Sequence, residues 1–444
     1  RSRRRPRRRR IQPQRTRRRC GRYRLITGAG GERGSDHRSA LRRLTGVDLD
    51  TFADRFWGVA PKLTRSADLP GSFEDLMTVD AVDELIAERG VRTPFVRMAK
   101  DGRLVDRAKF TASGGFGAEI TDQVDSGAVL ESFAAGNTLV LQGLHRLWPP
   151  LIHFVGDLVR ELGHPVQVNS YVTPAASQGF SPHYDVHDVF VVQIAGTKRW
   201  TVHSPVHMHP LDDQPWSDRR SAVEERASQT SALDVVLEPG DVLYLPRGWI
   251  HSAQALGATT VHLTIGVASF NDYDIAQRTL EALADVEALR APLPAGLDPT
   301  DLESVGPHVR RVLDAMRTAL DDMARDPESV RRLANRLADR YDALVRPEPV
   351  RPLRSVTAME ALSGEDSIRL RPGILARITR GAEGVSLVLR NKTVTMPLQC
   401  ADALEHLLAG SPCRLDLLPG LDTDDAVVVA RRLIREGIAV SVTH

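Results

Sequence analysis

The spacing of hydrophobic residues changes twice along the chain, near residues 166 and 271. Between these points, short apolar runs alternate with Gly and Pro turns, a pattern typical of short strands. After residue 271 the apolar residues recur every three or four positions, which favours amphipathic helices. We therefore expect a disordered tail at 1–40, a β-rich domain at 41–270, a helical region at 271–346 and a mixed domain at 350–444.

Short strands are predicted throughout the β-rich domain. Apolar runs bounded by turn residues lie at 166–172, 189–194, 199–202, 235–237, 242–245 and 261–267. Strands at this spacing predict a small antiparallel barrel or sandwich. The part before residue 166 predicts a mixture, with helices near 50–57, 72–76, 80–85 and 148–162 and strands at 91–100 and 138–141.

The helical region predicts three amphipathic helices. Their apolar positions lie at 280–289, 309–323 and 330–344, in each case on one face. Helices of this kind form a bundle or a dimerisation face.

The last region predicts a compact α+β domain. A hairpin is expected at 385–396, and helices are expected at 401–408 and 424–435. This order of elements resembles a winged helix, a module that binds either DNA or protein. Because acidic residues nearly balance the arginines of the last helix, the sequence does not favour DNA over protein.

The composition is that of a globular protein without a membrane segment. Hydrophobic residues make up 42% and charged residues 26% of the 444 residues, a length that predicts two or three domains. No apolar run is long enough to cross a membrane, and no apolar stretch follows the basic first residues. Three cysteines without a CxxC motif argue against a disulfide framework and against a thiolate zinc site. We therefore expect a cytoplasmic protein.

Positive charge is concentrated at the beginning of the chain. Arg occupies 14 of the positions 1–24, where no Asp or Glu occurs, so the rest of the chain is acidic although the formal net charge is +2. A run of this kind is expected to be disordered, and it can bind phosphate backbones by releasing counterions. A general preference for Arg over Lys explains the run equally well, so nucleic-acid binding is one of two hypotheses.

Two histidines and an aspartate have a spacing that suits a metal site. His183 and Asp185 are two residues apart, so in an extended segment both side chains leave the same face. One imidazole and one carboxylate are two of the three ligands of the facial triad, which leaves positions open on non-haem Fe(II). Turns at 239–241 and 246–248 precede His251, which places this residue at the start of another strand. Each residue alone has an ordinary structural explanation, but together they predict a metal site.

Other histidines provide alternative ligands. His203, His207 and His209 cluster in a Pro-rich loop that has no strand pattern behind it. His187 would share the ligand face only if its strand stayed regular. His262 lies in an apolar strand and is expected to be a core residue or a neighbour of the ligands.

Four motifs carry a resemblance to a known family. They are Asn169-x-Tyr171, His183-Tyr-Asp185, Gly196-Thr-Lys198-Arg-Trp and the later His251. They resemble the JmjC-type 2-oxoglutarate oxygenases of the ribosomal oxygenase group, in the cupin superfamily. The resemblance implies an α+β protein with a double-stranded β-helix (cupin/JmjC) core, a helical dimerisation region and a C-terminal winged-helix-like domain.

The resemblance also implies an activity and its cofactors. These are Fe(II), 2-oxoglutarate as cosubstrate, a homodimer, and hydroxylation of an Arg or His side chain of a ribosomal protein. Iron would be bound by His183, Asp185 and His251.

The resemblance implies roles for further residues. Lys198 would pair with the distal carboxylate of 2-oxoglutarate, since a buried carboxylate needs a cation. Asn169 and Tyr171 would line the same pocket as hydrogen-bond donors, and Thr264 would touch the cosubstrate. One departure is Gly266, where ribosomal members carry a hydroxyl residue, and it affects the side of the site that faces a peptide substrate.

Three other functions stay open from the sequence. The first is a 2-oxoglutarate oxygenase acting on a small metabolite or a peptide natural product. The second is a metal-binding cupin scaffold without catalysis, against which the complete triad and Lys198 argue. The third is zinc hydrolysis, which the absence of a motif such as HExxH weakens.

Overall fold

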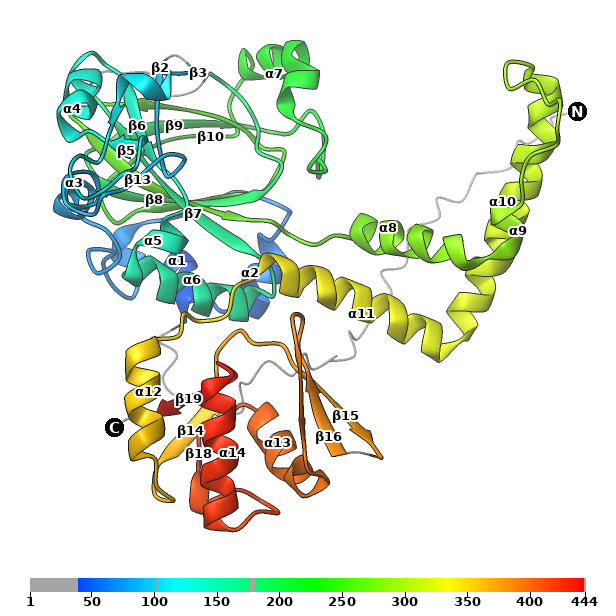
Figure 1. Cartoon of the computed structure of the whole chain (residues 1–444). Coiled ribbons are helices and arrows are strands. Elements are labelled where there is room, and N and C mark those ends of the chain that lie inside the picture. Colours follow the sequence, from blue (N-terminus) through cyan, green and yellow to red (C-terminus); the bar gives the residue numbers. More distant parts are fainter. Residues whose placement is uncertain (1–38, 101, 176–180, 383, 443–444) are drawn as a thin grey trace, which may run out of the picture.

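The computed structural model describes residues 39–100, 102–175, 181–382 and 384–442 (Figure 1). The predicted tail at 1–40 lies outside this range, apart from Ser39 and Ala40, which begin the first helix. The hypothesis that the tail binds nucleic acid therefore also concerns residues outside the described part. Among the helices that are described, none has the length and apolar character needed to cross a bilayer.

Two antiparallel sheets form the centre of the N-terminal part (Figure 1). The larger sheet has the strand order β1-β11-β8-β13-β7-β6-β2-β3, and the smaller has the order β10-β9-β12. The strands of the larger sheet, in chain order, are β1 (Lys62–Thr64), β2 (Val96–Lys100), β3 (Arg103–Leu104), β6 (Thr138–Leu141), β7 (Val166–Thr173), β8 (Asp188–Ala195), β11 (Val242–Leu245) and β13 (Thr260–Val267). Those of the smaller sheet are β9 (Lys198–His203), β10 (Leu233–Leu237) and β12 (Ile250–Ala255). All six strands predicted between 166 and 267 are present, with bounds shifted by at most two residues.

Strand β8 is buried on both of its faces. Phe190 and Val192 pack into the core that the larger sheet shares with the helices, whereas Val189 and Val191 pack between the two sheets. A strand with two buried faces is apolar throughout, which is why its sequence shows a continuous hydrophobic run instead of alternation. This strand begins three residues after Asp185 and anchors the segment that carries two of the predicted ligands.

Helices before and between the strands share the core of the larger sheet. They are α1 (Ala40–Thr45), α2 (Leu49–Arg55), α3 (Val79–Ala87), α4 (Ser126–Ala134), α5 (Leu144–Leu147) and α6 (Pro149–Leu162). Phe52 of α2, for example, meets the ring of Tyr244 edge-on, with 4.9 Å between the ring centroids. A short hairpin of β4 (Thr111–Ala112) and β5 (Gln123–Val124) lies between α3 and α4 in the chain.

The predicted helix at 72–76 is wrong. These residues form a turn, and the helix begins only at Val79, where the Thr78 side chain accepts a hydrogen bond from the Ala81 amide. Phe73 and Met77 of the turn are buried in the core. A segment this short gains too few helical hydrogen bonds to offset the cost of nucleation, so burial of its side chains decides its conformation.

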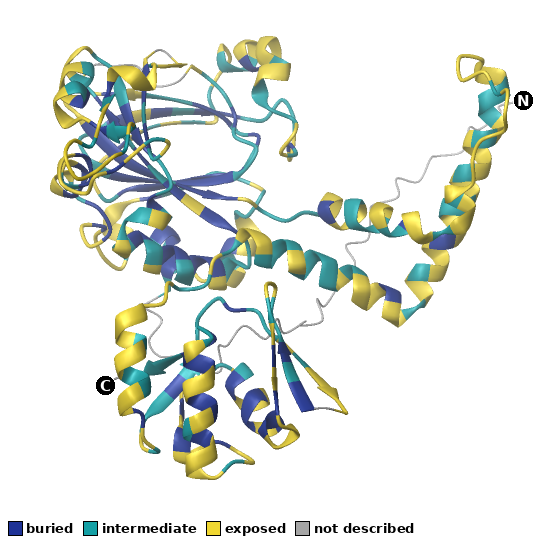
Figure 2. Ribbon diagram, viewed as in Figure 1, coloured by how far each residue is buried: buried dark blue, intermediate teal, exposed yellow. Residues whose placement is uncertain are grey.

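A helical arm leaves the barrel after β13 (Figure 1). It consists of α8 (Asp272–Ala282), α9 (Glu287–Arg290), α10 (Leu302–Arg325) and α11 (Pro327–Leu344), and α8 runs beside α11. The helix predicted over 280–289 is broken, because a 3-10 turn at Leu283–Asp285 and an extended Val286 separate α8 from α9. The apolar positions of α10 are left largely exposed along the arm (Figure 2).

The C-terminal part has a hydrophobic core of its own. It contains α12 (Pro352–Ala361), β14 (Ser367–Leu370), β15 (Arg377–Gly381), β16 (Gly384–Val388), β17 (Thr393–Met396), α13 (Ala401–Leu408), β18 (Cys413–Arg414), α14 (Thr423–Arg435) and β19 (Ala439–Val442). The strands form two sheets, β18-β14-β19 and β15-β16-β17. The predicted hairpin is β16–β17, and both predicted helices are present as α13 and α14.

Candidate metal and cosubstrate site

A cavity of about 290 Å³ opens between the two sheets. His183, Asp185 and His251 lie in its wall. Strands of both sheets contribute the rest of the lining, including Tyr171 and Thr173 from β7, Lys198 and Trp200 from β9, and His262 and Thr264 from β13. The cavity therefore collects most of the polar residues that the sequence singled out.

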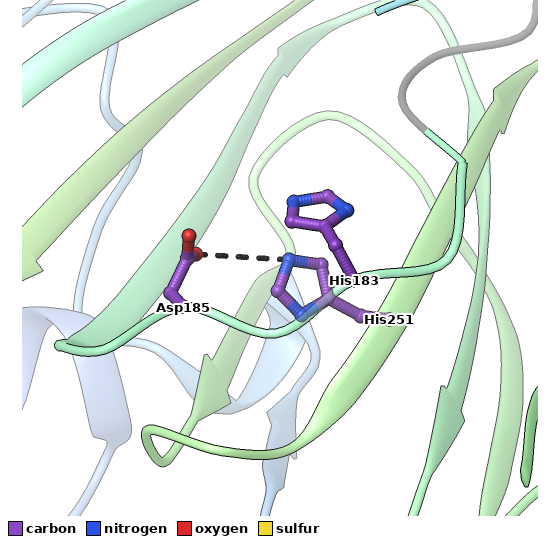
Figure 3. Close-up of side chains that lie close together, drawn as sticks. All are labelled: His183, Asp185 and His251. Carbon is purple, nitrogen blue, oxygen red and sulfur yellow. Dashed lines mark ion pairs between the residues drawn. The ribbon is translucent and has the colours of Figure 1, made fainter. Parts of the chain in front are cut away.

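The two histidines are held opposite each other by backbone hydrogen bonds. The His183 amide donates to the His251 carbonyl over 3.1 Å, and the His251 amide donates to the His183 carbonyl over 2.8 Å. His251 is the second residue of β12, as its expected place at a strand start requires, whereas His183 forms only an isolated bridge in the segment before β8. Asp185 points toward them from the same segment (Figure 3).

The donor atoms of these three residues converge. One ligand atom from each lies within 4.8 Å of the others, and Asp185 Oδ2 is 3.7 Å from His251 Nε2 (Figure 3). Among the residues described, this is the only group of three His, Cys, Asp or Glu side chains that comes together in this way. The alternative set of His203, His207 and His209 does not.

Carbonyl oxygens fix the tautomer of both histidines. His183 Nδ1 lies 2.8 Å from the Ser181 carbonyl, and His251 Nδ1 lies 3.0 Å from the Trp249 carbonyl. A carbonyl oxygen can only accept, so each Nδ1 carries the hydrogen and each Nε2 carries the lone pair. An outer hydrogen bond of this kind orients a metal-binding imidazole.

The protonation states suit metal binding as well. Burial, and then repulsion by His183, lower the pKa of His251 to about 4, although Asp185 opposes this shift. Burial raises the pKa of Asp185, but the imidazoles of His251 and His187 outweigh it and hold the pKa below its ordinary value. At neutral pH the site therefore offers a neutral imidazole beside a carboxylate, the forms that bind a cation.

Lys198 is a buried cation on the opposite side of the cavity. Its Nζ donates to Thr173 Oγ1 over 3.1 Å, which links β9 of the smaller sheet to β7 of the larger one. Burial lowers its pKa to about 8. No carboxylate of the described residues lies within ion-pairing distance, so the position suits an anion that enters the cavity.

Aromatic residues next to Lys198 also have polar atoms without partners. Trp200 Nε1 and His262 Nδ1 are buried and have no hydrogen-bond partner within the described part of the chain. Burial and the neighbouring Lys198 lower the pKa of His262 well below its ordinary value, so the ring is neutral. His262 stacks on Tyr171 with 5.2 Å between ring centroids and meets Trp200 edge-on at 5.6 Å. These polar atoms would gain partners from a polar ligand.

Asn169 has a different contact from the one expected. Tyr171 and Thr264 line the cavity, as the resemblance implies. Asn169 is not among the lining residues, and its Oδ1 accepts a hydrogen bond from the Gly143 amide over 3.0 Å. It therefore holds the loop before α5 against β7, a contact that depends on tertiary structure and that its motif alone cannot reveal.

Comparison with known proteins agrees with this geometry. Residues 152–275 match the family model of the JmjC domain. The chain contains a JmjC domain.

Proteins similar in sequence to this chain include a ribosomal oxygenase and a histidyl-hydroxylase. The chain is 28% identical over 294 residues to ribosomal oxygenase 1 of Gallus gallus, which covers 65% of this chain and 46% of that protein. It is 28% identical over 310 residues to the bifunctional lysine-specific demethylase and histidyl-hydroxylase NO66 of Dictyostelium discoideum, which covers 62% of this chain and 59% of that protein. The match thus spans less than two thirds of either relative.

A solved structure supports the fold. The crystal structure of the Escherichia coli ribosomal oxygenase YcfD superimposes with a TM-score of 0.50 and 16% identity, and the match covers 89% of this chain and 98% of that one. At this identity the likeness concerns the fold alone. The resemblance seen in the sequence and the JmjC/cupin core are confirmed.

Trp216 is a residue of the JmjC domain that sequence analysis missed. It begins a 3-10 turn at Trp216–Arg219 before α7 (Arg220–Ala227), lines the cavity, and lies 6.3 Å from the His183 ring between centroids. The guanidinium of Arg220 lies 4.6 Å from the centre of the Trp216 ring. Its loop is held by Tyr184, whose hydroxyl donates to the Gln214 carbonyl. The sequence shows only a Trp in a Pro-rich loop.

Gly266 of β13 is in close contact with His187. A Cβ atom at position 266 would lie 2.5 Å from Cδ2 of the His187 ring. The imidazole thus fills the space that a side chain would need, and it sits close enough to Asp185 to lower the pKa of that carboxylate. The departure from the family motif at Gly266 therefore makes room for His187, which lies two positions after the predicted ligand Asp185.

A side chain at position 266 should therefore be tolerated only if His187 is shortened. We expect Gly266→Ala to lower the free energy of unfolding of the metal-free protein by about 1–3 kcal/mol, the usual cost of overpacking. In the His187→Ala background the same change should cost clearly less. Denaturant titrations of the four proteins of this double-mutant cycle measure the difference.

Gly71→Ala serves as the control, because a Cβ there meets no atom within 4 Å. An equal loss of stability from Gly266→Ala in both backgrounds would show that the two residues do not compete for space.

Proposed function

We propose that this chain is an Fe(II)- and 2-oxoglutarate-dependent dioxygenase. The observation that carries the proposal is the convergence of His183, Asp185 and His251 on one point of a cavity whose other side holds the buried Lys198. Two imidazoles and one carboxylate form the facial triad typical of non-haem Fe(II) oxygenases. The donor set lacks thiolates, and its nitrogen atoms already have their lone pairs available, so it fits this ion.

The residues of the chain would bind and orient the reactants. When bound, the iron would supply the oxidising chemistry, with O2 as the oxidant: one oxygen atom would enter succinate, formed with carbon dioxide from 2-oxoglutarate, and the other would enter the substrate. Lys198 would hold the distal carboxylate of 2-oxoglutarate, and Thr173 would keep the ammonium in place. Tyr171 and Thr264 would border the same anion. Burial between the sheets excludes water from these contacts and strengthens them.

For the substrate, we propose an Arg or His side chain of a ribosomal protein. The names of the relatives, ribosomal oxygenase and histidyl-hydroxylase, support this choice. An enzyme of this kind would act in the cytoplasm. Trp216, at the triad, would contact the substrate side chain. Lys198 is a buried cation without a carboxylate partner among the described residues. This argues against a scaffold without catalysis, because a buried charge that binds no anion costs stability.

Loss of one triad residue should abolish turnover. We expect His183→Ala to lower succinate formation from 2-oxoglutarate at least about 100-fold, because even residues behind the ligands contribute 10–100-fold. His209→Ala, from the alternative histidine set, should leave it unchanged. Succinate is quantified with purified protein, Fe(II), ascorbate and a ribosomal protein mixture, and mass spectrometry then identifies the protein that gains one oxygen atom.

Equal turnover in the wild type and in His183→Ala would refute the triad. Turnover without any oxidised ribosomal protein, combined with oxidation of an added metabolite or peptide, would keep the oxygenase and replace the substrate.

Lys198 should determine the affinity for 2-oxoglutarate. We expect Lys198→Met to raise the KM about 10- to 100-fold, the value of one charge-assisted hydrogen bond. Lys62→Met is the matched control, since Lys62 also donates to a threonine hydroxyl but lies outside the cavity. A KM that rises equally in both variants would contradict this role.

The same lysine predicts a pH dependence. Since the pKa of Lys198 is lowered to about 8, the side chain is charged below this pH and loses its charge as the pH rises through it. The affinity for the dianion should then fall, by about tenfold per pH unit. Lys198→Arg should remove this dependence, because a guanidinium stays charged.

We further propose that the arm dimerises. Val309, Leu313 and Leu320 share one face of α10 and are 49%, 53% and 39% exposed. A second copy would cover this face, in agreement with the homodimer that the resemblance implies. Leu313→Arg should give a monomer in sedimentation velocity, whereas Thr318→Arg, on the opposite face, should not. An unchanged mass in Leu313→Arg would reject the proposal.

For the C-terminal part we propose a winged-helix-like module that contacts protein. Of the arginines on α14, Arg431 donates to the Met359 and Leu362 carbonyls, and Arg432 pairs with Glu436. Few cations of this helix are therefore available for phosphates. Binding of duplex DNA that is lost in Arg435→Gln would contradict this assignment.

A further inference from the structure

A second cavity, of about 570 Å³, lies outside the JmjC site. Helices α5 and α6, the end of α11, the linker at 346–349 and the segment at 369–375 form its walls. It shares no lining residue with the cavity that contains the triad. Its size falls in the range of pockets that bind small molecules and cofactors.

The linker is fixed to both sides of this cavity. Val345 packs against the core of the JmjC part. On the other side, the Glu348 amide donates to the Pro372 carbonyl over 2.9 Å. Gly373 has a φ of +78°, and a Cβ there would lie 3.1 Å from Cα of Pro347, so only glycine allows this close approach. The cavity thus lies where specific contacts hold the two parts of the chain together.

The lining has more arginines than carboxylates. Its cations are Arg146, Arg160, Arg346, Arg369 and Arg371, and its carboxylates are Asp157 and Glu348. Arg160 pairs with Asp157, and Arg369 pairs with Glu348 over 3.3 Å. For the other three arginines, no carboxylate of the described residues lies within 4.0 Å. Positive charge is therefore left uncompensated at this junction.

Two of these three arginines, Arg146 and Arg346, also repel each other. Burial, and then the charge of Arg346, lower the pKa of Arg146. Burial, followed by the charge of Arg146, lowers the pKa of the neighbouring His145 to about 4. Arg371 has a buried Nε with no hydrogen-bond partner in the described structure. A bound anion would relieve this repulsion and give the guanidinium groups acceptors.

Apolar side chains also line the cavity. Tyr341, Leu344 and Ile374 contribute an aromatic ring and aliphatic side chains. We propose that the cavity binds a phosphorylated ligand of nucleotide size, with its phosphates on Arg146, Arg346 and Arg371 and its ring against these apolar side chains. One guanidinium group can bind two phosphate oxygens at once. A site with more than one cation favours an anion with more than one charge.

Calorimetric titration of the full chain with ADP, pyrophosphate and adenosine tests this site. ADP should bind, pyrophosphate should bind more weakly because it lacks the ring, and adenosine should bind at least tenfold more weakly than ADP. Arg346→Gln should weaken ADP at least tenfold, and Arg346→Lys should weaken it less. Arg354→Gln, an exposed arginine that does not line the cavity, is the matched control.

Because every variant keeps the Arg-rich residues 1–24, anion binding by that segment cancels in the comparison. Arg146→Gln is the second variant and should reproduce the loss if Arg346→Gln does not fold. Equal ADP affinity in wild type, Arg346→Gln and Arg146→Gln, or no binding of ADP at all, would overturn the proposal.

A short single-stranded RNA distinguishes the two sources of such a phosphate ligand. If it binds more tightly than ADP and depends equally on Arg346, the cavity takes a nucleotide within a strand. If ADP binds and the RNA shows no dependence on Arg346, the ligand is a free nucleotide.

Discussion

The pair of backbone hydrogen bonds between His183 and His251 is the contact on which the JmjC site depends. His183 belongs to the segment that enters the larger sheet at β8, and His251 lies in β12 of the smaller sheet. The bridge joins the two sheets at the cavity and sets the imidazoles opposite each other. Asp185 follows in the same segment and is carried to the same point. The ligand geometry is thus a property of backbone pairing, which substitution of neighbouring side chains leaves intact.

A second link between the sheets places the cation. Lys198 of β9 donates to Thr173 of β7 across the cavity, on the side away from the bridge. One side of the cavity therefore has a carboxylate and two imidazoles that can bind a cation, and the other side has the fixed positive charge of Lys198. A ligand with a carboxylate at each end fits this division of charge once a cation bound by the triad offsets the charge of Asp185. The low pKa of Lys198 reflects the desolvation that the protein accepts when the cavity lacks an anion.

The features that could be predicted from the sequence are those that depend on short-range patterns of residues. The strands between 166 and 267 were recognisable because β8 is buried on both faces and its neighbours are bounded by turns. The triad was recognisable from His183 and Asp185 two residues apart. Contacts between distant segments left no such pattern. Examples are the hydrogen bond that Asn169 accepts from the Gly143 amide, the position of Trp216 in the cavity wall, and the break between α8 and α9. Each of these is set by packing that no local window contains.

The two cavities hold positive charge in different ways, and this difference bears on what each can select. Lys198 is one desolvated ammonium between two sheets, so it favours a single carboxylate in a site of fixed size. At the junction, Arg146 on α5 and Arg346 in the linker are exposed and Arg371 in the C-terminal turn is half-buried, so they favour a larger anion with several oxygen atoms. Because the linker at 346–349 is held by both parts of the chain, a ligand there would also tie the C-terminal part to the JmjC domain. The junction thereby gains a reason to keep Arg146 and Arg346, whose charges otherwise repel each other.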